Sequence, residues 1–326
     1  MNSRIFAVAC AAAWAVLPAA QAADTSGSYP TKTIRMVIAF SPGGPSDILS
    51  RLIGGKLAER MGQPFVFDNR PGAGGNVAGE IVASSPADGY TIMIANNSIL
   101  AANATLYKKM PFNPAKDLVP VVWIASQPNI LVVHPTVPAK SVKELIDHLK
   151  ANPGKLNYAS SGSGAAAHLA GELFKSMTKT DMVHIPFKGA GPAITDVLGG
   201  RSQMIFATAL SVKAYLDAGR LRPLGLTTLK RMDTLPGIPT IAESGVPGFE
   251  ATTWHGLVAV NGTPKPVLAR LNSEVNAILK DAQTVKFLEG QGAIIEGGTP
   301  EKFAAHIKAE IPKWAKVIKE SGAKAD

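Results

Sequence analysis

The chain of 326 residues contains a single cysteine, Cys10. This cysteine lies in an N-terminal segment that we expect to be removed, so the mature chain would have no thiol for an internal disulfide or for nucleophilic catalysis. Aromatic residues make up only 6% of the sequence, and after residue 22 no apolar run is long enough to cross a membrane. The composition therefore predicts a water-soluble α/β protein that does not depend on disulfides.

The sequence also lacks any concentrated block of basic residues, although its formal net charge is +9. The excess of positive charge is shared between the middle of the chain, residues 128–250, and the segments that flank it. Nucleic-acid binding requires a concentrated basic patch, so we expect no nucleic acid as a partner. A mild positive field spread over the surface favours anionic small molecules, and plain solubility explains it equally well.

The first 22 residues have the pattern of a secretory signal peptide. Arg4 provides a weakly positive start, Ile5–Ala19 is apolar and alanine-rich, and Ala20-Gln21-Ala22 forms a small-x-small cleavage site. The apolar segment is short for a membrane anchor, and the residues before Cys10 lack the large aliphatic residue of a lipoprotein signal. We expect export to the periplasm, which leaves a mature chain of about 300 residues, enough for two domains.

The stretch Thr33–Asp47, TIRMVIAFSPGGPSD, contains the local pattern on which the interpretation depends. The β-rich apolar run Ile34–Phe40 predicts a buried strand, and the apolar spacing beyond the glycines predicts a helix that Ser46 or Asp47 would cap. A strand, a glycine-rich turn and a helix N-terminus present backbone N–H groups to an anion. An ordinary strand-to-helix turn has the same local pattern, so the repetition of the pattern is important.

The same pattern of strand, glycine-rich turn and helix recurs along the chain. Further turns lie at residues 70–76, 160–164 and 188–192, each after a predicted strand and before a predicted helix. The first of them partly resembles a dinucleotide fingerprint, but its sixth position is Val77 and no acidic residue is placed for a ribose. We therefore expect no cofactor. The repeats predict α/β units with glycine turns at the ends of parallel strands.

The order of the predicted elements indicates an inserted domain. Two predicted strands are separated at Ala125–Asn129, where the chain would enter the insertion, and the proline- and glycine-rich stretch Pro236–Pro247 reads as the linker that leaves it. We expect residues 23–127 and 251–326 to form one α/β lobe and residues 128–250 to form the other, with a cleft between them. Such lobes would close by rotation at the two crossings.

Five stretches of the sequence carry a resemblance to a known family. They are YPTKTIRMVIAFSPGGPSDILSRLIGGKL, VFDNRPGAGGNVAGEIVASSPADGYTIM, LNYASSGSGAAAHLAGELF, VHIPFKGAGPAITDVLGG and PGIPTIAESGVPGFEATTWHGL. From about Tyr29 onward, the chain resembles substrate-binding proteins of the tripartite tricarboxylate transporter family, the Bug-type receptors. The resemblance implies a two-lobed, type II-like periplasmic-binding-protein fold that closes on a small carboxylate for the membrane subunits of a transporter or for a sensor. Dicarboxylates, tricarboxylates, acidic amino acids and aromatic acids all remain open as ligands.

The resemblance also implies which residues grip the carboxylate, largely through main-chain groups of one loop from each lobe. In the first lobe they are Phe40, Ser41, Pro42, Gly43, Gly44 and Asp47. In the second lobe they are Ser160, Ser161, Gly162 and Ser163. An aspartate cannot bind an anion directly, so we expect Asp47 to cap its helix and to fix the loop.

Other turns supply further candidates. Lys188, followed by Gly189, is the one cation in the predicted loops of the second domain and would reach a distal acid group, although a solvated lysine beside a turn is the simpler interpretation. Asn97 and Thr208 follow predicted strands and are candidates for the rim of the cleft.

We expect no metal site. His168 and Glu172 lie four residues apart on a predicted helix, but no third ligand has a suitable spacing. His184 lies in a predicted strand, where packing or edge polarity explains it.

An exported hydrolase that uses the same cleft is the alternative function. Ser161 and Ser163 are candidate nucleophiles, but the sequence around them is A-S-S-G-S-G rather than G-x-S-x-G, and no histidine is marked as their base. We therefore expect a monomeric, non-catalytic receptor. Binding without turnover would separate the two functions.

The small-x-small site predicts a mature protein that begins at Ala23. Intact-mass measurement of the protein recovered from the periplasm tests this. A mass that still includes residues 1–22, or one that includes a lipid on Cys10, would contradict the prediction.

Overall fold

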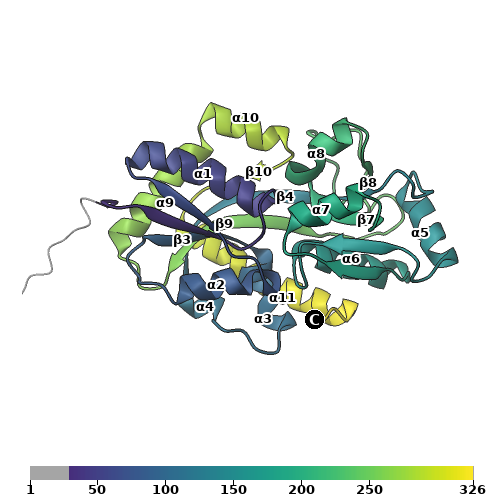
Figure 1. The fold of residues 1–326 in the computed structure, drawn as a ribbon, viewed down its shortest axis with the longest axis horizontal. Helices are drawn as coiled ribbons and strands as arrows, with labels where there is room; N and C mark the ends of the chain where they lie inside the picture. The colour runs from purple at the N-terminus through teal and green to yellow at the C-terminus, as the bar shows by residue number, and fades with distance from the viewer. Residues whose placement is uncertain (1–28, 326) are drawn as a thin grey trace, which may run out of the picture.

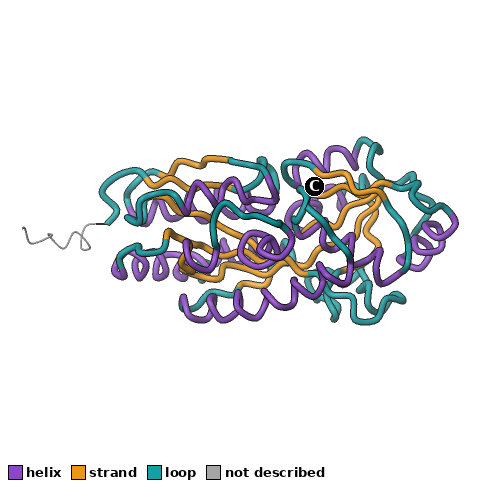
Figure 2. The backbone as a smooth tube through the Cα atoms, turned by 90° about the horizontal axis from the view of Figure 1, so that it is seen from below, coloured by secondary structure: helices purple, strands orange, loops and turns teal. Residues whose placement is uncertain are grey.

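The computed structural model describes residues 29–325 and contains two lobes side by side along the long axis of the molecule (Figure 1). Helices lie on both sides of the strands (Figure 2). The predicted signal peptide and its cleavage site before Ala23 lie outside the described residues. Within residues 29–325, no helix combines the length and the apolar character that a membrane span requires.

The first lobe is built around three parallel strands. They are β1 (Ile34–Ile38), β2 (Phe65–Asn69) and β3 (Thr91–Asn96). The helical segments of this lobe are α1 (Pro45–Met61), η2 (Ala73–Gly75), α2 (Asn76–Ala83), η3 (Ser98–Ala102), α3 (Asn103–Leu106), α4 (Pro114–Asp117), α9 (Lys265–Leu279), α10 (Ala282–Gly290) and α11 (Pro300–Ser321). The apolar run after Thr33 forms the buried strand that the sequence predicts, although the strand ends at Ile38.

The second lobe repeats the arrangement. Its strands are β5 (Asn157–Ser160), β6 (Val183–Pro186), β7 (Met204–Thr208) and β8 (Arg222–Leu226), and its helices are α5 (Val142–Ala151), α6 (Ala166–Thr178), α7 (Ala190–Leu198) and α8 (Ala209–Asp217). Strand β5 pairs in parallel with β6 and β7. The predicted amphipathic helix forms as α5, and the Ser141 hydroxyl caps it by accepting a hydrogen bond from Glu144 N–H.

One strand, β4 (Leu118–Val133), runs from the first lobe into the second. The predicted break at Ala125–Asn129 is wrong. Strand β4 pairs with β9 (Thr252–Val260) as far as Pro128 and with β7 and β8 beyond it. The strand tolerates Pro128 because this residue, which has no N–H to donate to a neighbouring strand, lies where the partner of β4 changes from β9 to β7 and β8. The strand order is β2-β1-β3-β9-β4-β7-β5-β6, and β8 and β10 (Ile294–Ile295) also pair with β4.

The stretch Pro236–Pro247 is a packed part of the second lobe, so the prediction of a free linker is wrong. Ile241 is fully buried, and its N–H donates to the Leu226 carbonyl at 2.8 Å. Leu226 N–H in turn donates to the Pro239 carbonyl at 2.7 Å. The prolines and glycines make the turns, while the apolar residues between them attach the loop to the core.

Helix α11 connects the crossing strand β9 with the second lobe. Glu310 is buried and accepts hydrogen bonds from the indole N–H groups of Trp254 on β9 and of Trp314, each at 2.8 Å. At the C-terminal end of the helix, the Ser176 hydroxyl on α6 donates to the Glu320 carbonyl at 3.3 Å. The end of α11 accordingly lies beside α6 in Figure 1.

Replacing Glu310 with alanine would leave two buried indole N–H groups without an acceptor, each at a cost of about 1–3 kcal/mol. We expect Glu310→Ala to lower the free energy of unfolding by about 2–6 kcal/mol. The loss should be smaller for Glu310→Gln, whose amide oxygen still accepts a hydrogen bond. Chemical denaturation measures both.

The matched control is Glu320→Ala, at an exposed position of the same helix. It should change stability by less than about 0.5 kcal/mol. An equal, small effect of Glu310→Ala and Glu320→Ala would show that the buried carboxylate does not hold α11 in place.

Candidate functional site

The carboxyl ends of the parallel strands in the two lobes face each other, which is where open α/β sheets bind ligands. Ser41, after β1, donates hydrogen bonds from its N–H and its hydroxyl to the Lys188 carbonyl, each at 2.9 Å. The Tyr107 hydroxyl donates to the Ser163 carbonyl at 2.8 Å. The glycine-rich turns that the sequence singles out are thus in direct contact across the interface.

Helix α1 begins two or three residues before the position that the sequence predicts. Its N-cap is Gly44, and Pro45 takes the first helical position. The prediction of Ser46 or Asp47 as the N-cap is wrong because proline has a backbone angle suited to the first turn and lacks an N–H that would stay unpaired there. The backbone of the PGG turn therefore leads directly into the helix.

Asp47 fixes this loop from behind, as the sequence predicts. Its Oδ2 accepts a hydrogen bond from Gly43 N–H at 3.1 Å, and its Oδ1 accepts from Arg51 at 3.0 Å and from Asn69 at 3.1 Å. Burial alone would raise the pKa of Asp47, but the hydrogen bonds from Arg51, Gly43 and Asn69 outweigh it and hold the pKa below its usual range. Asn69 also donates to the Phe40 carbonyl at 2.8 Å.

Two histidines brace the corresponding turn of the second lobe. Ser160 Oγ lies 2.6 Å from His184 Nε2 and accepts a hydrogen bond from Gly162 N–H at 3.1 Å. His168 Nδ1 accepts from Gly164 N–H at 3.0 Å, and the two imidazoles stack with centroids 4.1 Å apart. His184 is thus a hydrogen-bonding partner of the turn as well as a packing residue.

Helix α7 also begins earlier than expected. The sequence predicts a start near Ala193, but the helix begins at Ala190, with Gly189 as its N-cap. Pro192 marks no boundary because proline fits the first turn of a helix. The earlier start brings the first turn of α7 close to the PGG turn of the first lobe, where a Cβ on Gly44 would lie 3.3 Å from the Ala190 Cβ.

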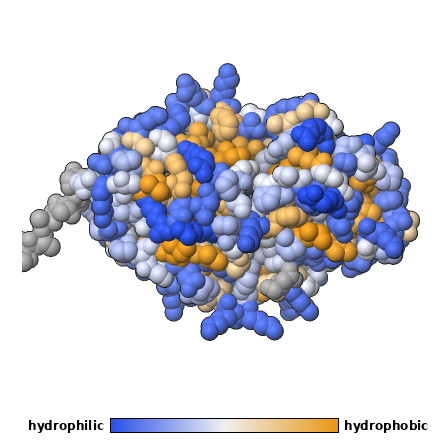
Figure 3. Space-filling view, viewed as in Figure 1, coloured by the Kyte–Doolittle hydropathy of each residue, from blue (hydrophilic) through white to orange (hydrophobic). Residues whose placement is uncertain are grey.

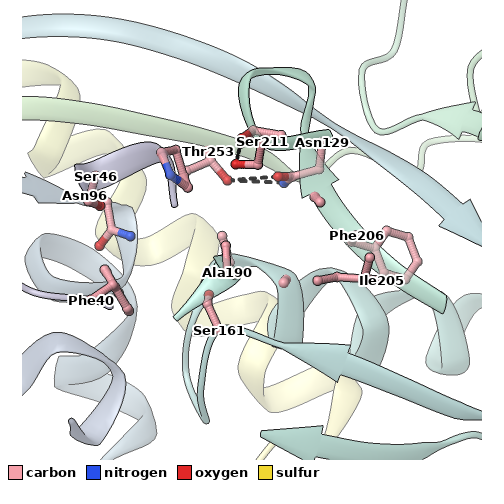
Figure 4. Close-up of a pocket in the computed structure, with 15 residues that line it drawn as sticks. Phe40, Ser46, Asn96, Asn129, Ser161, Ala190, Ile205, Phe206, Ser211 and Thr253 are labelled. Carbon is pink, nitrogen blue, oxygen red and sulfur yellow. Dashed lines mark hydrogen bonds between the residues drawn. The ribbon is translucent and has the colours of Figure 1, made fainter. Parts of the chain in front are cut away.

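A cavity of about 40 Å³ lies between the lobes (Figure 4). Residues from the first turns of four helices line it: Pro45 and Ser46 of α1, Ala166 and Ala167 of α6, Ala190 of α7, and Ser211 of α8. Each helix N-terminus carries unpaired N–H groups and a partial positive charge of roughly half an elementary charge. None of the described residues that line the cavity has a charged side chain. The partial positive charge that these helix N-termini bring to the cavity therefore comes from the backbone.

Polar side chains line the side of the cavity next to the crossing strands. Asn129 Nδ2 on β4 donates to Thr253 Oγ1 on β9 at 3.1 Å, as the dashed lines in Figure 4 indicate. Thr208 and Ser211 lie with their hydroxyl oxygens 3.0 Å apart at the start of α8. Asn96, at the end of β3, lies on the opposite side beside Ser46. These groups can donate to or accept from a bound molecule.

A buried histidine lies behind Ser46. His255 Nε2 is 3.1 Å from the Ser46 hydroxyl oxygen, and the ring is fully buried. Burial lowers the pKa of His255 to about 3, so the imidazole is neutral at physiological pH. His255 therefore orients the serine without adding a charge to the site.

The predicted site residues fall into three groups. Phe40, Ser161 and Thr208 line the cavity, and an adjoining outer cavity is lined by Phe40, Ser161, Gly162, Ser163 and Lys188. Ser41, Pro42, Gly43, Gly44 and Gly189 lie where the two lobes touch. Asp47, Asn97 and Ser160 are buried behind the loops, and Asn97 Nδ2 is 3.5 Å from the Thr252 carbonyl oxygen.

The sequence pattern does not mark several residues that line the cavity, among them Asn96, Asn129, Ala190, Ser211 and Thr253. Asn96 precedes the predicted Asn97 at the end of the same strand, so the strand end indicates this part of the cavity without indicating which of the two residues lines it. Asn129 and Thr253 meet only because β4 and β9 are antiparallel neighbours. No local pattern marks such a pair.

Among residues 29–325, no three His, Cys, Asp or Glu side chains gather closely enough to hold a metal ion. His168 and Glu172 are both engaged elsewhere. Glu172 accepts a hydrogen bond from Tyr158 at 2.6 Å and pairs with Lys175 at 3.1 Å.

Comparison with known proteins identifies the family. The model of the tripartite tricarboxylate transporter family receptor matches residues 49–323. This chain belongs to that family. The receptor is 36% identical over 313 residues to protein BugT of Bordetella pertussis, with 96% of this chain and 95% of BugT covered.

Solved structures agree with this assignment. Rpa4515 of R. palustris, solved with adipate, is 41% identical with a TM-score of 0.89, covering 91% of this receptor and all 100% of that chain. MatC (Rpa3494) from Rhodopseudomonas palustris, solved with malate, is 30% identical with a TM-score of 0.86, covering 89% and 100%. The likeness confirms the predicted two-lobed fold and the predicted role as a periplasmic-type solute receptor.

The close contact between the lobes of the receptor requires glycine at position 191. A Cβ there would lie 2.4 Å from the Pro42 carbonyl oxygen across the interface. Gly191 lies in the first turn of α7, where alanine is otherwise favourable. We expect Gly191→Ala to hold the lobes apart and to speed amide hydrogen exchange at Ser41, whose N–H bonds to the Lys188 carbonyl, with the melting temperature unchanged.

Gly55→Ala is the matched control, because a Cβ at this helical position meets nothing within 4 Å. Hydrogen–deuterium exchange measured by mass spectrometry compares the two variants with the parent. Unchanged protection of the Ser41 amide in Gly191→Ala would mean that the glycine contact does not control closure.

Proposed function

We propose that this protein captures a small organic carboxylate between its lobes and delivers it to the membrane subunits of a tripartite tricarboxylate-type transporter. The observation that carries the proposal is the convergence of four helix N-termini on a cavity without a charged side chain among its described lining residues. Backbone N–H groups at helix N-termini bind carboxylates by charge-assisted hydrogen bonds. A sequence that resembles a signal peptide precedes Ala23, and this supports action in the periplasm.

A dicarboxylate is the best-supported ligand class. Relatives that are 41% and 30% identical were solved with adipate and with malate, and both of these are aliphatic dicarboxylates. The cavity of about 40 Å³ has room for a few water molecules. It is far smaller than the ~300 Å³ typical of ligand pockets, so the lobes must separate to admit a ligand and close again around it.

A receptor without catalytic activity is favoured over an exported hydrolase. Two serines are paired with histidines. Ser160 is fully buried and serves its own turn. Ser46 lies 3.1 Å from His255 Nε2, but burial lowers the pKa of this imidazole to about 3, which makes it a poor general base at neutral pH. Ser161 lines the cavity beside alanines and helix N-termini, a setting that suits binding of a carboxylate rather than attack on an ester. The proposal also includes a division into two lobes, one formed by residues 23–127 with 251–326 and the other by residues 128–250. It further includes a monomeric state.

A thermal-shift screen over organic acids, followed by calorimetry, tests the proposal. We expect one saturable site for a carboxylate, no chemical change of the bound acid by NMR, and a smaller radius of gyration in solution scattering at saturation. Stabilisation by no carboxylate would overturn the receptor proposal, and formation of a product would favour the hydrolase.

Thr208→Val probes the side chains of the cavity. The Thr208 hydroxyl does not cap α8, so its loss should spare the fold, and a hydrogen bond to a charged group contributes about 1.5–3 kcal/mol. We expect an affinity at least about tenfold weaker by calorimetry. Thr195→Val, at an exposed position on α7, should bind like the parent. Equal affinities of both variants would remove Thr208 from the site.

A further inference from the structure

A larger outer cavity adjoins the small cavity between the lobes. Its volume is about 290 Å³, close to the lower limit for small-molecule sites. Phe40 and Ser161 line both cavities, so the two are neighbouring compartments of one interface. The further lining residues of this outer chamber are Gly72, Ala73, Gly74, Tyr107, Gly162, Ser163, Pro186, Phe187 and Lys188.

The walls of the outer chamber come from both lobes. The turn after β2 supplies Gly72–Gly74, whose three residues all have positive φ. A Cβ on Gly74 would lie 2.6 Å from the Ser163 carbonyl oxygen, so the turns of the two lobes pack directly together here. Tyr107 spans the same contact through its hydrogen bond to that carbonyl. The chamber therefore exists only when the lobes are together.

The chemistry of the outer chamber differs from that of the inner cavity. The rings of Phe40, Phe187 and Tyr107 make its walls apolar or aromatic, and Lys188 is the one charged residue among the described residues that line either cavity. The Lys188 backbone is held in place because its carbonyl accepts two hydrogen bonds from Ser41. Its ammonium group belongs to none of the ion pairs between described residues, such as that of Lys175 with Glu172.

We propose that the outer chamber receives the far end of an elongated aliphatic dicarboxylate, and that Lys188 pairs there with the second carboxylate. This inference rests on the proposed function, in which the helix N-termini of the inner cavity hold the first carboxylate. The apolar walls between the two ends suit a methylene chain. A diacid of the length of adipate is thus preferred over both a monoacid of equal length and a shorter diacid.

Calorimetry with the mature protein and three probes tests the inference. The probes are adipate, hexanoate, which has the same length but one carboxylate, and succinate, which is shorter. We expect the parent to bind adipate at least tenfold more tightly than either of the others. Lys188→Met should lose at least tenfold in adipate affinity and less than twofold for hexanoate, while Lys188→Arg should retain adipate affinity within about threefold.

Lys155→Met is the matched control because it removes the same charge from an exposed site in the second lobe, just before β5 and away from the chamber. It should leave adipate affinity within twofold of the parent. Equal losses for adipate and hexanoate in Lys188→Met, or no loss for either, would overturn the role of Lys188.

The chamber proposal and the proposed function fail in different ways. Binding of hexanoate or succinate as tightly as adipate, or binding of another carboxylate without adipate, overturns the chamber proposal and leaves the carboxylate receptor intact. If the parent binds no carboxylate at all, the proposed function fails, and the chamber proposal fails with it.

Discussion

The two lobes of this receptor meet backbone to backbone, and this close approach is possible only where side chains are absent. A Cβ on Gly189 would lie 2.7 Å from Ser41 N, and one on Gly191 would lie 2.4 Å from the Pro42 carbonyl oxygen. Because no side chain separates the two backbones, the Ser41 N–H of the first lobe reaches the Lys188 carbonyl of the second. The small cavity, its enclosure by helix N-termini and the outer chamber all depend on this contact.

The same geometry decides the electrostatics of the site. A buried arginine would have to be desolvated to meet a carboxylate, and that cost is several kcal/mol. Helix N-termini are fixed dipoles that the fold has already oriented, so they bind an anion without this cost. The neutral imidazole of His255 and the pairing of Asp47 with Arg51 keep uncompensated charge away from the cavity. Such a site suits a carboxylate group in general, which would leave selectivity to the walls around the rest of a ligand.

Three elements connect the lobes: the strand β4, the neighbouring strand β9 and the helix α11. Strand β4 changes its partner at Pro128 and Asn129, and the Asn129 side chain at this point hydrogen-bonds to Thr253. The cavity between the lobes is therefore lined in part by the strands that pass between them. The face of the molecule seen in Figure 3 is a mosaic of hydrophilic and hydrophobic residues, with no single apolar surface over the lobes.

The sequence by itself determined the strands, the glycine-rich turns and most helices, because buried β-rich runs and turn residues act over a few neighbours. It also indicated that Phe40, Ser161 and Thr208 follow strands whose ends would gather. Tertiary structure decided the rest. Asn129 and Thr253 face the cavity because two distant strands pair, and β4 continues through Pro128 because its neighbours change there. Which residues line the cavity depends on how distant segments pair and pack, and a local sequence pattern carries no information about that pairing.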